Sequence, residues 1–242
     1  MHPLCSLVAM LVIFSFVQAV TAIDGSRLHL LAYICMSCLI FAGSLGSLFI
    51  HEYAHVLTAR RVGVPVHEVT LSLLGAYTLI RTETVEPHKT LIIACAGPAA
   101  NIITGITLFA VSCAFPQSAV FSPVCFALVA FNGLLSVYNL IPVMPLDGGM
   151  IVRSLLWVLS GDWLWSTRRA LVIGNGFAVL CMLAGIMLIF TRQSVLSVLI
   201  FLLGVSLWKR EKSVLQQVLT ADILHIVTMS ECRKEVMGDA IR

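Results

Sequence analysis

Charged residues are scarce in this sequence, and their scarcity excludes an ordinary soluble domain. Only 11% of the 242 residues are Asp, Glu, Lys or Arg, whereas 59% are hydrophobic and the mean hydropathy is +1.00. Soluble domains carry about 25% charged residues and roughly 45–50% apolar ones. The composition is therefore that of a membrane protein, and the small net charge of +3 gives no reason to expect a nucleic-acid partner.

The charges that are present lie between long apolar runs. A membrane-spanning helix needs about 20 apolar residues. We therefore expect an all-α polytopic membrane protein with six transmembrane helices, at about residues 4–23, 28–58, 91–115, 124–141, 170–190 and 194–208. The first run ends in small residues, as a signal peptide does. It has no Lys or Arg before it and is too long for one, so we expect an uncleaved span.

The Lys and Arg residues indicate the orientation of these spans. With the N-terminus in the cytoplasm, six spans place thirteen of the fifteen Lys and Arg residues on the cytoplasmic side and leave only Arg27 and Arg192 outside. This distribution follows the positive-inside rule, and it disappears if the sixth and shortest span is omitted. The sequence thus predicts two cytoplasmic termini, a six-span domain over residues 1–208 and a cytoplasmic tail over residues 209–242.

The sequence shows neither a disulfide framework nor an internal repeat. Seven of the eight cysteines lie inside apolar runs, where cysteine packs as a small hydrophobe.

Between the second and third spans, residues 62–88 are too polar for a helix in lipid. Valine and leucine recur there at near two-residue spacing, which predicts a short β-hairpin. Because unpaired strand edges cannot face lipid, this hairpin should lie at the membrane interface or line a cavity.

Acidic residues are almost absent from the apolar runs. Of the twelve, ten fall in loops or in the tail, whereas Glu52 continues the second run and Asp147 closely follows the fourth. An ionisable side chain at membrane depth costs at least a few kcal/mol. No Lys or Arg lies in either segment to form an ion pair, so both acids are candidates for a functional site.

Glu52 lies within the motif His51-Glu52-Tyr53-Ala54-His55. Four residues of α-helix turn about 400°, so the two histidines lie on one face, one turn apart. Two imidazoles placed in this way can bind one Zn²⁺ ion, and the adjacent glutamate can act as base toward a water molecule.

A catalytic zinc usually has three protein ligands, and Asp147 is the remaining acid near the membrane. Pro142 and Pro145 before it and the glycines after it allow the chain to leave the helix and turn. In the predicted topology the second and fourth spans both run from outside to cytoplasm. His55 and Asp147 are therefore expected at similar depth, near the cytoplasmic face.

These motifs, in this order, resemble the site-2 protease (M50) family of intramembrane zinc metalloproteases. The resemblance is strongest to the compact six-span group that includes a sporulation protease, which processes a pro-sigma factor. Residues 51–55 match the HExxH motif of the family. Asn139, Pro142 and Asp147-Gly148 match its N-P-D-G element, and residues 97–101 (Gly-Pro-Ala-Ala-Asn) are similar to its GPxxN element. The resemblance covers roughly residues 28–208.

The resemblance implies one zinc ion per chain, with three ligands: His51, His55 and Asp147. Glu52 would be the general base. Three further residues would help to hold the substrate: Asn139, Pro142 and Asn101. For Asn101, a packing or helix-kink role is an equal alternative.

The implied substrates are membrane-anchored proteins, cleaved in or near their transmembrane segments in a bacterial cell membrane. The hairpin would pair with the unwound substrate by strand addition. The sequence also departs from the family. Its tail is too short for the nucleotide-sensing CBS domain of many compact members, and Gly75-Ala76 stands where the family has paired glycines.

Three other functions fit parts of the pattern. A metal transporter usually places its site near the bilayer midplane, often between internal repeats, and neither feature is evident. A non-catalytic relative would lack one of the catalytic positions, and all of them are filled. An HExxH protease with a glutamate as third ligand would need another acid at membrane depth. The sequence gives no indication of the oligomeric state.

Overall fold

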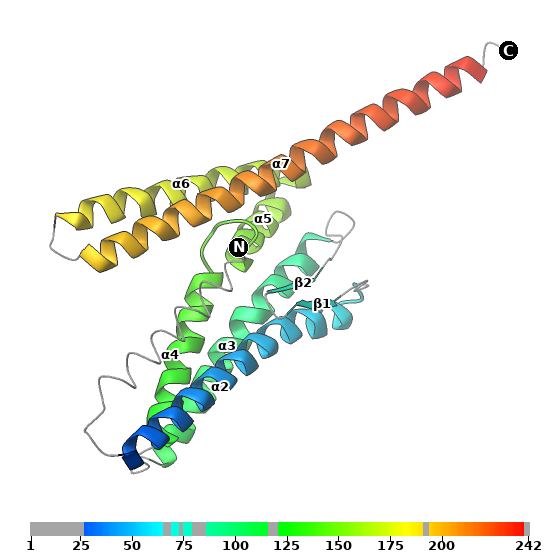
Figure 1. The fold of residues 1–242 in the computed structure, drawn as a ribbon. Helices are drawn as coiled ribbons and strands as arrows, with labels where there is room; N and C mark the ends of the chain where they lie inside the picture. The colour runs from blue at the N-terminus through cyan, green and yellow to red at the C-terminus, as the bar shows by residue number, and fades with distance from the viewer. Residues whose placement is uncertain are drawn as a thin grey trace. The chain divides into compact units, whose positions relative to one another are not determined.

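The computed structural model describes residues 27–64, 69–72, 75–78, 86–115, 121–190 and 194–239. In chain order its elements are α2 (Arg27–Arg61), β1 (Val69–Ser72), β2 (Gly75–Thr78), α3 (Pro87–Ala114), α4 (Phe121–Asn139), α5 (Asp147–Ser160), α6 (Trp163–Ile189) and α7 (Ser194–Asp239) (Figure 1). The chain divides into two compact units, Met1–Ile141 and Pro142–Arg242. The predicted first span, residues 4–23, lies outside the described residues.

Four helices of the described part are long and apolar enough to cross a membrane: Ile34–Arg61, Pro87–Ala114, Phe121–Asn139 and Trp163–Ile189. They coincide with the predicted second, third, fourth and fifth spans. The protein is therefore an integral membrane protein built from helices. The first and sixth spans stay predictions.

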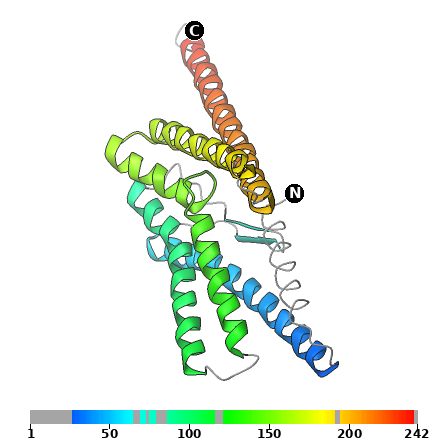
Figure 2. The ribbon, with the colours of Figure 1, turned by 90° about the vertical axis from the view of Figure 1, so that its left-hand side faces the viewer.

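In the first unit, α2, α3 and α4 pack side by side (Figures 1 and 2). Small and polar residues are among their contacts. Asn132 on α4 donates a hydrogen bond to Ser47 Oγ on α2 at 2.9 Å, and Ser136 donates one to the Pro98 carbonyl on α3 at 3.3 Å. Many large apolar side chains are exposed, among them Ile103, Ile106 and Val137. Small residues and interhelical hydrogen bonds inside, with bulky apolar groups outside, are typical of helices that pack within lipid.

Two strands lie in the segment for which the sequence predicts a hairpin. β1 and β2 pair antiparallel, with Val69 opposite Thr78 and Ser72 opposite Gly75. The location of these strands at the membrane interface stays a prediction.

In the second unit, α6 and α7 run side by side (Figures 1 and 2), and glycines bring their backbones close together. A Cβ atom on Gly185 would lie 2.6 Å from the Phe201 amide nitrogen, and one on Gly204 would lie 2.8 Å from the Ala178 carbonyl oxygen. α7 continues without interruption from Ser194 to Asp239. The predicted boundary at residue 208 therefore falls inside a helix.

α6 begins at Trp163, before the predicted start of the fifth span near residue 170. The reason is a cap outside the apolar run: the Asp162 carboxylate accepts a hydrogen bond from the Trp165 amide at 2.9 Å. The preceding helix, α5, ends at Gly161, whose positive φ of 71° suits glycine. The apolar run thus marks the part of α6 that suits lipid, and the cap marks where the helix starts.

Candidate metal centre

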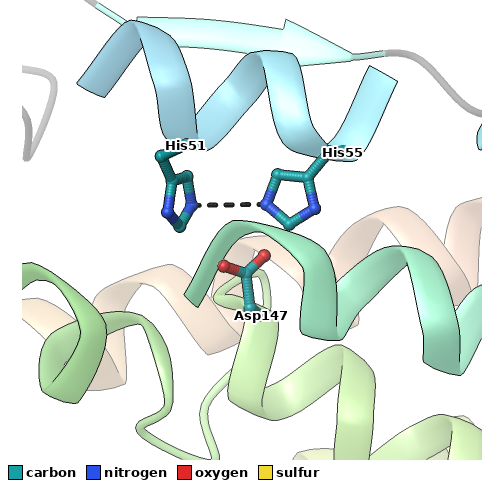
Figure 3. Close-up of side chains that lie close together, drawn as sticks. All are labelled: His51, His55 and Asp147. Atoms are coloured by element: carbon teal, nitrogen blue, oxygen red, sulfur yellow. Dashed lines mark hydrogen bonds between the residues drawn. The ribbon is translucent and has the colours of Figure 1, made fainter. Parts of the chain in front are cut away.

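The two histidines of the HExxH motif lie one turn apart on α2 and are both buried, with 4% of His51 and 9% of His55 exposed. Their Nε2 atoms face each other at 3.3 Å (Figure 3). Two nitrogen ligands held about 2.0–2.1 Å from a tetrahedral zinc ion are roughly 3.3–3.4 Å apart. The observed separation is therefore the one that a shared zinc ion requires.

The ring of His55 is oriented by α3. Its Nδ1 atom lies 2.7 Å from the Ile93 carbonyl oxygen. A carbonyl oxygen only accepts hydrogen bonds, so Nδ1 of the neutral ring carries the proton and Nε2 keeps its lone pair. This is the tautomer in which Nε2 can bind a metal, and such a hydrogen bond on the other ring nitrogen is usual for ligating histidines.

The ring of His51 is held by Asn101, also on α3. The Asn101 amide lies 2.8 Å from His51 Nδ1, its side chain has no exposed surface, and its Oδ1 atom has no hydrogen-bond partner within the described chain. The oxygen and nitrogen of an amide exchange places on a 180° rotation. The structure places Nδ2 against the ring; after such a rotation Oδ1 would accept the Nδ1 proton of His51, leaving Nε2 as the nitrogen that can bind a metal, and Nδ2 would take the position in which Oδ1 has no partner.

Ile93, Gly97 and Asn101 follow one another at four-residue spacing, so they share one face of α3. At Gly97 the helix passes directly beneath the imidazoles. A Cβ atom there would lie 2.6 Å from His51 Cε1 and 2.7 Å from its Nε2, and it would also collide with His55 Nε2. Glycine thus keeps open the space into which both Nε2 atoms point. The structural roles of Ile93 and Gly97 were missed in the sequence, where the spacing of this face could have indicated them.

Asp147 is the first residue of α5, where the helix dipole favours a carboxylate. The segment before it folds back tightly. The Leu146 amide donates to the Val143 carbonyl at 2.9 Å, and a Cβ atom on Gly149 would lie 2.6 Å from the Met144 amide nitrogen. Gly149 is therefore needed for this close passage of backbone, which sets where α5, and with it Asp147, begins.

One group of three potential metal ligands occurs among the described residues: His51, His55 and Asp147. Each offers one ligand atom, and these atoms all lie within 4.8 Å of one another (Figure 3). The donor set of two imidazole nitrogens and one carboxylate oxygen suits zinc.

The structure also places Glu52, Asn139 and Pro142, three further residues of the predicted site. Glu52 is half-buried on α2, beside His51 in the helix. Asn139 is the last residue of α4, and Pro142 lies in the segment before α5; both are half-buried. Their predicted roles depend on a substrate and stay predictions.

Glu211, one of the acids that the sequence places in the tail, is buried. Its side chain has no exposed surface. Burial raises the pKa of Glu211 to about 7, although the nearby Met144 backbone amide lowers it. Gly204, Leu207 and Glu211 follow one another at helical spacing on the face of α7 that packs against α6. This periodicity was the signal that could have identified Glu211 as a buried residue.

A model of peptidase family M50 matches two overlapping stretches of the chain, residues 39–124 and 114–183. Rip3 of Mycobacterium tuberculosis, whose name describes it as a candidate zinc metalloprotease, is 40% identical over 121 residues, which are 49% of this chain and 31% of that protein. A zinc metalloprotease of Methanocaldococcus jannaschii is 33% identical over 141 residues, which are 58% of this chain and 41% of that protein. The chain thus spans less than half the length of either relative.

Among solved structures, the site-2 protease from Methanocaldococcus jannaschii has a similar fold. The match has a TM-score of 0.52 with 22% identity and covers 84% of this chain and 87% of the other. The stretches matched by the family model make up more than half of the chain and contain the histidine pair, the Ile93–Asn101 face of α3 and Asp147. This chain belongs to peptidase family M50.

Proposed function

We propose that this protein is an intramembrane zinc metalloprotease that hydrolyses peptide bonds in or near the transmembrane segments of membrane-anchored protein substrates. The observation that carries this proposal is the pair of buried Nε2 atoms, 3.3 Å apart, on a helix apolar enough to span the membrane. Family membership supports a peptidase, and the donor set supports zinc. Relatives of the same family are named zinc metalloproteases.

His51, His55 and Asp147 are the proposed ligands of one zinc ion per chain. When bound, zinc would polarise the scissile carbonyl and lower the pKa of a water molecule toward neutrality. The Ile93 carbonyl keeps His55 in the tautomer that binds metal, and Asn101 does the same for His51 when its Oδ1 faces the ring. The chain's own contribution is thus a histidine pair already spaced for one ion, with an Asp147 carboxylate oxygen within 4.8 Å of its nitrogens.

Glu52 is the proposed general base. It is next to His51 on α2 and only half-buried, so its carboxylate can reach a water molecule at the site. The carboxylate takes a proton from the attacking water and returns it to the departing amine. A positioned base of this kind contributes about 10²–10⁴-fold to the rate.

The substrate must unwind locally, because a helix keeps its carbonyls in hydrogen bonds. β1 and β2 offer strand edges to which an extended segment can add, and Asn139 and Pro142 are proposed to hold the chain near the metal. We further propose six spans within residues 1–208, a cytoplasmic tail over 209–242, and a site near the cytoplasmic face of a bacterial cell membrane.

The test compares Glu52→Gln with the wild type in purified protein and in cells. Glu52→Gln should keep about one zinc per chain, measured by elemental analysis, because the three ligands are intact. It should lose at least about 100-fold in cleavage, seen as membrane-protein fragments that appear only when the active form is expressed. Glu86→Gln is the matched control, because Glu86 is exposed at the start of α3 and its carboxylate pairs with Lys89 at 3.0 Å, within the same helix turn.

Two outcomes would count against the proposal. Normal cleavage by Glu52→Gln would show that another group is the base. A wild-type protein that exchanges zinc rapidly with the medium and releases no fragments would instead indicate a metal transporter.

A further inference from the structure

Glu211 is a buried acid to which the proposed mechanism gives no role. It lies on α7, one turn beyond the fully buried Leu207, and its side chain has no exposed surface. Burying a carboxyl group costs free energy unless the group is hydrogen-bonded or paired. The groups that surround Glu211 therefore indicate its role.

The Glu211 carboxyl occupies a space that exists because residue 174 is glycine. A Cβ atom on Gly174 would collide with Glu211 Oε1 and would lie 2.6 Å from the carboxyl carbon. The same Cβ atom would lie 3.0 Å from the Pro142 carbonyl oxygen. α6, the Glu211 carboxyl and the backbone of residue 142 therefore meet at one point within the second unit.

The segment that meets Glu211 leads directly to Asp147. The Met144 backbone amide lies close enough to the Glu211 carboxyl to lower its pKa. Neither carboxyl oxygen has a hydrogen bond of ordinary geometry to a described group. Val143 is fully buried and accepts from the Leu146 amide at 2.9 Å. Residues 142–146 therefore lie between the Glu211 carboxyl on one side and the backbone of Gly149 on the other.

We infer that Glu211 is a positioning residue, whose carboxyl holds residues 142–146 so that α5 begins with Asp147 in place. The inference rests on the proposed function, because Asp147 matters here as a metal ligand. In its protonated form the carboxyl can donate to a backbone carbonyl of this segment, and that of Pro142 is adjacent. The middle of α7, where Glu211 lies, is thereby coupled to the start of α5.

Variants of Glu211 separate positioning from simple packing. Glu211→Gln keeps the shape and a donor, so its zinc affinity and kcat should stay within about threefold of wild type. Glu211→Leu keeps the volume but loses the polar contact. It should raise the zinc Kd about tenfold, measured by competition with a fluorescent chelator, and lower kcat at unchanged KM. Hydrogen exchange of residues 142–149 should also become faster.

Three further variants accompany these two. Gly174→Ala places a methyl group where the carboxyl lies and should behave like Glu211→Leu. Gly176→Ala on the same helix should behave like wild type, because a Cβ atom there meets nothing within 4 Å. Leu207→Ala loosens the packing of α6 and α7 without reaching the carboxyl. It should lower Tm but leave the zinc Kd and the exchange of residues 142–149 unchanged.

The results can overturn the inference independently of the enzyme assignment. If Glu211→Leu and Gly174→Ala keep the wild-type zinc Kd and exchange rates, Glu211 only packs between helices. If Leu207→Ala changes them as much, general loosening is the cause. If the wild type binds no zinc and cleaves nothing, the proposed function fails, while the exchange of residues 142–149 still reports whether Glu211 holds this segment.

Discussion

At the scale of single residues, the site depends on two hydrogen bonds from α3 to the imidazoles of α2. The Ile93 carbonyl and the Asn101 amide each contact an Nδ1 atom, at 2.7 and 2.8 Å. Both contacts are buried, where a polar atom without a partner is costly. The same two bonds therefore stabilise the helix pair and leave the Nε2 atom of each ring facing the proposed metal position.

Asn101 should act on zinc affinity through His51. Asn101→Leu removes the acceptor for the Nδ1 proton and should raise the zinc Kd by about 10–100-fold, the usual effect of losing such an outer partner. Asn101→Asp keeps an acceptor oxygen and should retain most of the affinity. Titration against a chelator of known affinity measures both. If Asn101→Leu keeps the wild-type zinc affinity and only its KM rises, Asn101 has the substrate-binding role instead.

At the scale of elements, α3 is the support for the metal-binding face of α2. Its Ile93–Gly97–Asn101 face combines two hydrogen-bonding groups with the one residue that has no side chain. One turn before His51 on α2, Ser47 accepts a hydrogen bond from Asn132 of α4. The histidine-bearing helix is thus fixed by polar contacts with both of its neighbours.

Gly97→Ala tests this close approach of α3. The added methyl group would lie within 2.7 Å of ring atoms of His51 and against His55 Nε2, and neither helix can withdraw without breaking the buried hydrogen bonds. We expect zinc binding to fall at least about tenfold and cleavage to fall with it. Gly105→Ala, two turns further along α3, is the matched control. Its Cβ atom would meet only Asn132 Cβ, at an ordinary 3.7 Å, so equal losses in both variants would refute the interpretation.

At the scale of the whole molecule, the positions of Lys and Arg predict the topology. Thirteen of the fifteen lie on the cytoplasmic side of a six-span arrangement. α7 is continuous, so a sixth span over residues 194–208 would carry the tail out of the membrane as an unbroken helix. The orientation of this one helix decides on which side the tail lies.

Reporter fusions measure that orientation. Green fluorescent protein fused after Arg242 should fluoresce, because it folds in the cytoplasm, whereas alkaline phosphatase at the same place should be inactive. Fusions after Ser118, between the predicted third and fourth spans, should give the opposite pattern and serve as the control. An active phosphatase after Arg242 would mean that residues 194–208 do not cross the membrane.

Much of this protein follows from local features of its sequence. Apolar runs predicted the four helices that are long enough to span, because lipid requires about 20 apolar residues whatever the neighbours are. The four-residue spacing of His51 and His55 predicted that they share one helical face, because that depends only on helix periodicity. Where local signals act outside the runs, as the Asp162 cap does for α6, the predicted bounds were less accurate.

Other features were decided only by packing between segments far apart in the chain. The sequence left Asn101 open between packing and catalysis, and its contact with His51, fifty residues away, appears only when α3 lies against α2. Glu211 stands among Lys209, Arg210 and Lys212 and resembles a solvated residue, yet the tertiary structure buries it against Gly174. Helix periodicity depends on neighbouring residues alone, whereas burial depends on which surfaces meet. The sequence therefore determined the donors, and the tertiary structure decided what holds them in place.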